Sequence, residues 1–297
     1  MQEQILAKFD CLMISIPKIQ LLIKQQHQFC DELKSSSSHQ STHAQCKSIS
    51  NLFIKFSSHF YLYSIFCAAH SRATQLNHSE LQPKLGIIDG SIESVDQLLI
   101  KPIQRILKYP LLLTQMQIYS NEQLEAIKEL DKINVYINEM QRINEEYGAI
   151  FEYLIRSHYK QTQQLIDDFS LVSLLYYGGV DWLNAQDFLG HKMSAKLELH
   201  SMVFVFKNCV VFLCKEIMRH KKKLIEIIRH QQLIPVNELQ VRNVNSNEWH
   251  VIHLKLNGVK KSEKIYKLMN SKCELKMNFL KEIRSIIRQS VAQMNYK

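Results

Sequence analysis

The sequence predicts a two-domain α+β protein, with an all-α elongated helical bundle followed by a β-barrel that a C-terminal helix caps. Only 7 Gly and 5 Pro occur in 297 residues, which favours long helices over a turn-rich sheet protein. Apolar residues recur every three or four positions through 121–155, whereas short β-rich runs follow residue 170. The length allows one domain, but this change of pattern favours two, at 1–168 and 169–297.

The first half begins with two expected helices and a polar run between them. Residues 4–33 have helical spacing, and Pro17 should kink or break that helix. Residues 34–47 contain so many Ser, His and Gln that we expect a flexible connection. A second helix is expected over 48–72. Its segment 60–70 is apolar almost all round, which is typical of a helix buried in a bundle.

Two further helices follow an irregular stretch at 74–91. Helical spacing returns from 92 to 119. The next helix, at 121–155, has its apolar residues three and four apart throughout, which predicts one continuous buried stripe. The residues of this stripe are Leu124, Ile127, Leu130, Ile133, Ile137, Met140, Ile143 and Tyr147.

The second half changes to short runs of β-forming residues with strand-like spacing. These runs are 171–183, 201–214, 223–228, 239–244, 249–256 and 264–269. The chain closes with 273–291, where Leu275, Phe279, Leu280, Ile283, Ile286 and Ile287 form one apolar stripe. A small barrel followed by one amphipathic helix that plugs its end is the arrangement we expect.

The net charge of +9 is unevenly distributed along the chain. Residues 1–168 contain 16 Lys and Arg against 18 Asp and Glu, whereas the remainder contains 21 against 10. A basic second half indicates a polyanionic partner, either a phospholipid surface or nucleic acid. The near-neutral first half should recognise its partner by shape. No stretch is apolar and long enough to span a bilayer, and the start lacks a signal peptide's basic region, so we expect a soluble intracellular protein.

Two classes of function are disfavoured by missing signatures. Nucleic-acid binding is the first, because no helix-turn-helix, zinc-finger spacing or aromatic-rich sheet signature accompanies the basic charge. Covalent catalysis is the second, because HExxH, GxSxG, P-loop and GxGxxG motifs are absent. His250 and His253 should point to opposite faces of a strand, and the seven cysteines form no CxxC pair and should be reduced, mostly buried thiols. We expect no cofactor and no metal.

One segment gives the sequence a specific family resemblance. The run LLIKPIQRILKYPLLL at 98–113 resembles the third signature region of the Dbl-homology domain of Rho guanine-nucleotide exchange factors. The segments YSIFCAAH at 63–70 and YINEMQRINEEY at 136–147 resemble the Tiam and Still life branch, whose members act on Rac. Segments from 204 to 242 are similar to the pleckstrin-homology strands of the same branch. The resemblance implies a Dbl-homology domain followed by a pleckstrin-homology domain.

The resemblance also implies which residues bind a GTPase. By spacing alone, Ile100, Gln104 and Lys108 share one helix face, a mixed surface that suits a protein partner or is simply solvated. The family's pattern implies that Lys108 and Asn138 hold switch II of a Rho-family GTPase and that Gln104 is a neighbouring contact. It implies that Ile100 favours Rac over Cdc42. No residue is expected to be catalytic, because exchange needs no covalent step.

The family's first signature helix carries a glutamate that contacts switch I of the GTPase. It is expected to precede this start, and no counterpart is found in the sequence. Losing one buried charged contact costs on the order of 2 to 5 kcal/mol. The alternative function is therefore a weak or inactive scaffold module that binds a GTPase or phosphoinositide without promoting exchange.

A basic tract in the second half is the expected lipid contact. Lys215, Arg219, Lys221, Lys222 and Lys223 flank a turn between strands, and each cation near an anionic membrane contributes about 1 kcal/mol. The tract is interpreted as a phosphoinositide site of low selectivity, which implies a peripheral position at the plasma membrane. A solvated basic loop is the alternative for the same residues.

Overall fold

A computed structural model gives the fold for most of the chain. It describes residues 19–36, 41–68, 95–116, 120–166, 171–190, 198–220, 223–257 and 260–295. The contacts divide the chain into two compact units, Met1–Ala149 and Ile150–Lys297. The sequence predicted the boundary after residue 168, which lies beyond the end of the long helix Asn121–Thr162. Pro17 and the expected break at 74–91 lie outside the described residues.

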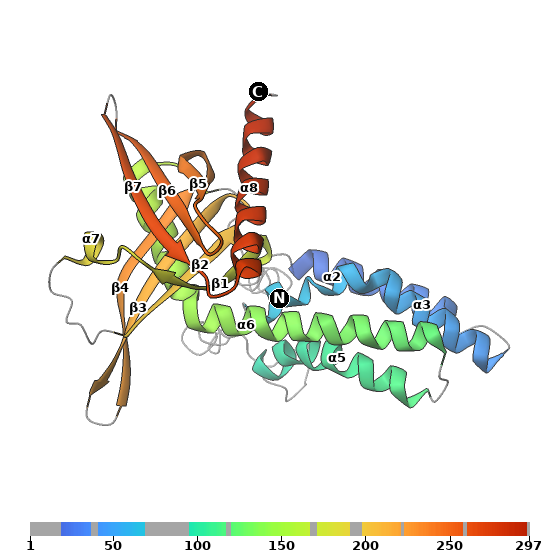
Figure 1. The fold of residues 1–297 in the computed structure, drawn as a ribbon. Helices are drawn as coiled ribbons and strands as arrows, with labels where there is room; N and C mark the ends of the chain where they lie inside the picture. Colours follow the sequence, from blue (N-terminus) through green and yellow to red (C-terminus); the bar gives the residue numbers. More distant parts are fainter. Residues whose placement is uncertain are drawn as a thin grey trace, which may run out of the picture. The chain divides into compact units, whose positions relative to one another are not determined.

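The first unit is built from helices that lie along one another (Figure 1). They are α2 (Ile19–Ser36), α3 (Thr42–Phe60), a short helical segment at 63–68, α5 (Val95–Gln115) and the first part of α6 (Asn121–Thr162). The expected helices are confirmed in the described residues, with one interruption. The helix predicted over 48–72 is interrupted by a turn at Tyr61 and Leu62, before the helical segment at 63–68.

The expectation of a flexible connection at 34–47 is wrong for most of that run. α2 continues to Ser36, where the Ser35 hydroxyl donates to the Asp31 carbonyl at 3.0 Å, and α3 already begins at Thr42. Cys46 is buried, and the Ser50 hydroxyl donates to its carbonyl at 2.8 Å. Packing of α3 against the other helices therefore outweighs the weak helix propensity of these polar residues. Only 37–40 lie outside the described residues.

An aromatic cluster forms the centre of the first unit. The ring of Phe29 is 1% exposed and lies edge-on to Phe53, Phe56 and Phe60, with centroids 5.1, 5.3 and 5.2 Å away. Tyr109 of α5 lies 5.8 Å from the same ring. Edge-to-face pairs add stabilisation beyond simple burial, so one side chain of α2 joins three helices. The segment 60–68 is largely buried, as its composition predicts.

The stripe predicted along α6 is buried from Leu130 onward, and Ile127 before it is partly buried. Leu130, Ile133, Ile137 and the later members are buried or nearly so, but Leu124 is 46% exposed. The first turn of α6 instead turns Gln123 inward, where its side-chain amide donates to the Leu113 carbonyl at 2.5 Å. One residue further along a helix points about 100° away, so Leu124 faces outward.

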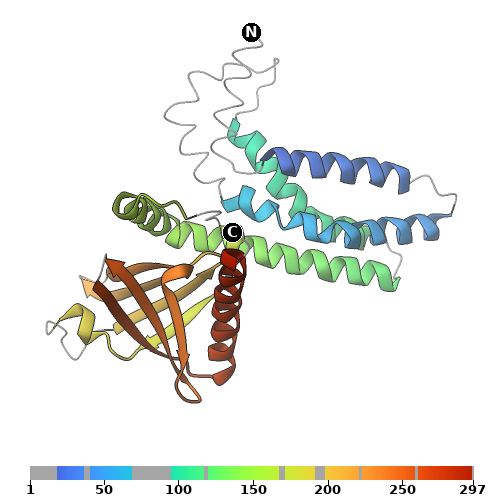
Figure 2. The ribbon, with the colours of Figure 1, turned by 90° about the horizontal axis from the view of Figure 1, so that it is seen from above.

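The second unit is a seven-stranded antiparallel sheet in the order β4-β3-β2-β1-β7-β6-β5. The strands are β1 (Leu174–Trp182), β2 (Glu198–Phe206), β3 (Cys209–His220), β4 (Lys223–Pro235), β5 (Leu239–Asn243), β6 (Glu248–Asn257) and β7 (Lys260–Met269). β1 pairs with β2 as far as Val180 and with β7 at Asp181 and Trp182. This change of partner curls the sheet around one core (Figure 2).

The β-forming run at 201–214 contains parts of two strands. β2 ends at Phe206 and β3 begins at Cys209, with only Lys207 and Asn208 between them. Val203 and Phe204 point to opposite faces and are both fully buried. Phe151, from the last part of α6, covers the outer face at 5.1 Å from Phe204. Strands buried on both faces have no alternation, so the hairpin looks like one long strand.

The C-terminal helix α8 (Cys273–Asn295) closes the barrel as predicted. It contacts β1, β2, β5 and the short turn η3 (Val236–Glu238). Phe279 stacks on Trp249 with centroids 5.1 Å apart, and Leu280, Ile283 and Ile286 are also buried, although Leu275 is 38% exposed. Lys276 is buried and donates to the Asn243 side chain at 3.0 Å and to the Asn245 carbonyl. Oxygen atoms at and just after the end of β5 therefore take the place of water around this ammonium group.

The cysteines of the described chain are all free thiols, and most are buried, as the sequence predicts. Within the described ranges, no helix is long and apolar enough to cross a membrane. A short helix, α7 (Gln186–Leu189), follows β1.

Removing the ring at the centre of the helical unit should destabilise it. Phe29→Ala deletes a fully buried aromatic side chain, for which the expected loss of unfolding free energy is about 3 to 5 kcal/mol. Urea unfolding followed by circular dichroism measures the loss. Ile23→Ala on the same helix is the control, because Ile23 is 41% exposed and should cost much less. Equal losses in the two variants would contradict the central role of Phe29.

Candidate interaction surfaces

α5 has one face in the core and one face in solvent. Ile106, Tyr109 and Leu113 are at most 3% exposed, and they recur at helical spacing. Ile100, Gln104 and Lys108, the residues expected to bind a GTPase, are all exposed. Their spacing of four places them on one side of the helix. The structure therefore brings these three predicted residues together on an outward-facing stripe.

Three leucines extend this stripe and were not singled out from the sequence. Leu107, Leu111 and Leu112 are 38%, 63% and 42% exposed. The signal was available, because Leu113 is the only leucine of the run at 111–113 that keeps the spacing of Ile106 and Tyr109. A contiguous apolar strip beside an amide and an ammonium group is typical of a protein-binding surface.

Tyr109 fixes the position of Lys108, its neighbour in the chain. Its hydroxyl accepts a hydrogen bond from the side-chain Nε2 of Gln26 at 3.0 Å. The side-chain Oε1 of Gln26 accepts one from the Tyr63 hydroxyl at 2.8 Å. The Arg105 guanidinium lies 5.5 Å from the Tyr109 ring centroid. Burial raises the pKa of both tyrosines, so both hydroxyls stay protonated. This network ties α5 to α2 and to the segment at 63–68.

Asn138 is exposed on α6, on the side turned toward α5. Gln123, fifteen residues earlier in α6, contacts the end of α5. At 3.6 residues per turn, the side chains of Gln123 and Asn138 leave the helix in directions that differ by about a sixth of a turn. α5 and α6 run antiparallel from that contact. With a rise of 1.5 Å per residue, Asn138 lies about 15 Å further along the pair than Lys108. A partner that contacts both residues must therefore span the two helices.

The basic tract lies around the turn between β3 and β4, as predicted. Lys221 and Lys222 lie outside the described residues, as do the side chains of Arg219 and Lys223. Lys215 is described: its ammonium group is 3.0 Å from Glu226 on the opposite strand, and the side chain is 11% exposed. Met218 and Ile225, opposite each other near the turn, are 38% and 43% exposed. Apolar side chains therefore accompany the cations of this hairpin.

Two family models match the chain, and together they cover nearly all of it. A RhoGEF domain matches residues 2–148, and a domain described as Tiam1 second PH domain-like matches residues 147–297. The protein still life, isoform SIF type 1, of Drosophila melanogaster is 47% identical over 279 residues, covering 83% of this chain. The human Rho guanine nucleotide exchange factor TIAM2 is 33% identical over 276 residues, covering 82%. The chain spans 13% and 16% of these two proteins' lengths.

Among solved structures, the DH/PH domains of PDZ-RhoGEF in complex with activated RhoA align with 94% of this chain and 82% of that chain. The identity is 18% and the TM-score 0.42. The linker-DH/PH domains of p115-RhoGEF align with 95% of this chain and 86% of theirs, at 15% identity and the same TM-score.

Substitutions at exposed and buried positions of α5 and α6 should have different effects on the free energy of unfolding. Lys108→Ala with Asn138→Ala changes only exposed side chains, so the free energy of unfolding should change by less than about 0.5 kcal/mol per site. Tyr109→Ala, one residue away, removes a buried ring and should cost about 3 kcal/mol or more. Urea unfolding compares the two. A large loss in the double variant would show that these side chains support the fold.

Proposed function

We propose that this chain, which belongs to the RhoGEF family and joins a RhoGEF domain to a domain like the second PH domain of Tiam1, promotes nucleotide exchange on a Rho-family GTPase. Rac is the proposed partner. The observation that carries the proposal is the exposed stripe of α5, where Ile100, Gln104 and Lys108 are held outward by the buried Tyr109. The similarity to Still life and TIAM2 supports it.

Exchange of this kind is a binding effect and needs no reacting group. A protein that binds the nucleotide-free GTPase more tightly than the loaded form must lower nucleotide affinity by the same factor. On the proposed surface, the Lys108 ammonium and the Asn138 amide hold switch II from two adjacent helices. Ile100 and the exposed leucines offer apolar area next to them. Only contacts that differ between the loaded and empty GTPase contribute to release.

The experiment is release of a fluorescent nucleotide from Rac, Cdc42 and Rho. The chain should accelerate release from Rac, and Lys108→Ala with Asn138→Ala should reduce that acceleration at least tenfold, since each tenfold corresponds to about 1.4 kcal/mol. Ile100→Ala should reduce the difference between the accelerations of nucleotide release from Rac and from Cdc42. The matched control is Lys24→Ala with Asn51→Ala, one exposed lysine and one exposed asparagine on α2 and α3.

The outcomes separate an exchange factor from a binding module. Acceleration that survives the double substitution would overturn the assignment of Lys108 and Asn138. No acceleration, with nucleotide-free Rac still captured, would favour the scaffold function. If the control pair reduced release as strongly as the test pair, the proposed surface would be wrong.

We also propose that the β3–β4 hairpin contacts an anionic phosphoinositide membrane, which would place the protein peripherally at the plasma membrane. Lys215, Arg219, Lys221, Lys222 and Lys223 cluster around its turn. The exposed pair Met218 and Ile225 supports this reading, because a membrane surface attracts cations and accepts apolar side chains together. A solvated basic loop would have no need of the apolar pair.

Vesicle sedimentation tests the hairpin with two sets of variants. Reversing the charges of Arg219, Lys221, Lys222 and Lys223 should abolish binding to vesicles containing phosphatidylinositol bisphosphate, whereas neutral vesicles should bind neither protein. Lys215 is left unchanged, because a glutamate there would face Glu226. Met218→Ser with Ile225→Ser should weaken binding without changing charge. Unchanged binding in the charge variant would exclude this membrane contact.

A further inference from the structure

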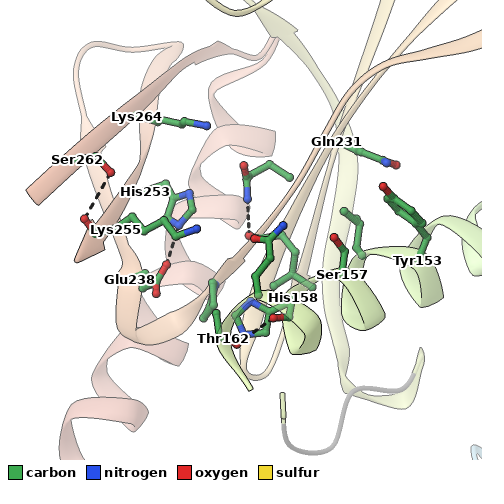
Figure 3. Close-up of a pocket in the computed structure, with 15 residues that line it drawn as sticks. Tyr153, Ser157, His158, Thr162, Gln231, Glu238, His253, Lys255, Ser262 and Lys264 are labelled. Carbon is green, nitrogen blue, oxygen red and sulfur yellow. Dashed lines mark hydrogen bonds and ion pairs between the residues drawn. The ribbon is translucent and has the colours of Figure 1, made fainter. Parts of the chain in front are cut away.

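A polar hollow of about 350 Å³ lies in the second unit, apart from both surfaces described above. Its walls come from the end of β4, from β6 and β7, and from the last turns of α6 (Figure 3). The exposed stripe of α5 and the turn of the β3–β4 hairpin contribute nothing to its lining. The chemistry of this hollow is therefore independent of the proposed exchange function.

Four side chains meet on one face of the β6–β7 pair at this hollow. His253 is directly opposite Lys264, and Lys255 is directly opposite Ser262. Residues two apart on a strand point to the same face of the sheet. The Cβ atoms of directly opposed residues in an antiparallel pair are only about 4.5 to 5.5 Å apart. The register thus gathers an imidazole, two ammonium groups and a hydroxyl. All four line the hollow (Figure 3).

The histidine is buried and only half satisfied. His253 is 6% exposed, and its Nε2 lies 2.7 Å from a carboxylate oxygen of Glu238. Its Nδ1 is buried and has no hydrogen-bonding partner. A buried polar atom without a partner costs free energy, which a ligand at this position would recover. Burial lowers the pKa of His253, as do Lys264 and Lys255, while Glu238 acts in the opposite direction.

The two lysines have no counter-charge of their own. No carboxylate in the described part of the chain lies within ion-pair distance of Lys255 or Lys264. Glu238, the acidic residue in the lining, is already paired with His253. Two like charges close together repel each other, so an anion between them would relieve that repulsion. The remaining lining is rich in hydroxyl and amide donors.

We propose that this hollow binds a phosphate-type oxyanion, with Lys255, Lys264 and His253 as its charged and hydrogen-bonding donors. A doubly charged oxyanion has enough oxygens to accept from both ammonium groups and from Nδ1 at once. In the bound state His253 is protonated and donates from both ring nitrogens, to Glu238 and to the ligand. Across the hollow, α6 contributes two titratable side chains to the lining, His158 and Tyr153.

The position of the hollow bears on the source of the phosphate group. Gln231, which lines the hollow, is eight residues along β4 from Lys223 at the hairpin turn. At about 3.3 Å per residue, the separation is about 26 Å. A membrane that contacts the hairpin turn would thus be distant from the hollow. We therefore place a free phosphorylated molecule first and a lipid headgroup second.

Titration calorimetry with the whole chain tests the site. The probes are inorganic phosphate, soluble inositol trisphosphate, and vesicles with and without phosphatidylinositol bisphosphate. Lys255→Gln with Lys264→Gln should weaken binding of the soluble probes at least tenfold. The matched control is Lys267→Gln with Lys272→Gln, which removes the same charge from exposed lysines nearby that do not line the hollow. The control should change affinity less than twofold.

A pH series adds a second measurement, the change of binding affinity with pH. The loss of a lysine charge alone would not alter this pH dependence. Sulfate is the probe, because it stays doubly charged between pH 5.5 and 7.5. The wild-type chain should bind it more tightly at the lower pH, and His253→Gln should remove most of that dependence. His158→Gln should leave it in place.

Each outcome decides the proposal. Binding of a soluble probe that the Lys255 and Lys264 pair controls supports the site with a free ligand. Binding only to phosphoinositide vesicles, lost in the same pair, supports the site with a headgroup as its source. No binding, or equal binding in the test and control variants, would overturn it. None of these results depends on whether Rac releases its nucleotide, so failure here and failure of the exchange proposal remain distinct.

Discussion

The contact between Phe29 and Tyr109 is the constraint on which the proposed GTPase surface depends. Phe29 packs against three phenylalanines of α3, and Tyr109 brings α5 onto the same cluster while its hydroxyl bonds to Gln26 of α2. Because a helix side chain's direction is fixed by its position, burying Tyr109 and Ile106 turns Lys108 and Gln104 outward. The core of this unit thus determines which residues a partner can reach.

Continuous helix α6 contributes to both units through different parts of its length. Leu130, Ile133 and Ile137 belong to the core of the helical unit. Phe151, beyond the division at Ala149, covers the outer face of the sheet at Phe204 and Phe206. Its last turns then form one wall of the polar hollow. A single helix therefore has a bundle role, a sheet-covering role and a site-forming role in succession.

The sheet register determines the second unit's candidate chemistry. His250 and His253 are three residues apart and pair with different carboxylates, Glu248 and Glu238, so they do not act together. His253 instead meets Lys264, eleven residues later in the chain, because the two are opposed across β6 and β7. The basic hairpin turn and the hollow are separate concentrations of positive charge on the same domain. A strongly basic sequence can hold more than one anion-binding surface.

Periodicity and a short signature were enough to predict the helices, the barrel with its capping helix, and the outward face of α5. These features depend on local spacing, which the chain specifies by itself. The helical start of α3 within a polar run and the inward turn of Gln123 were instead decided by packing between elements. So was the hollow: His253, Lys255 and Lys264 look ordinary in the sequence. Only strand pairing, a long-range property, places them on one face.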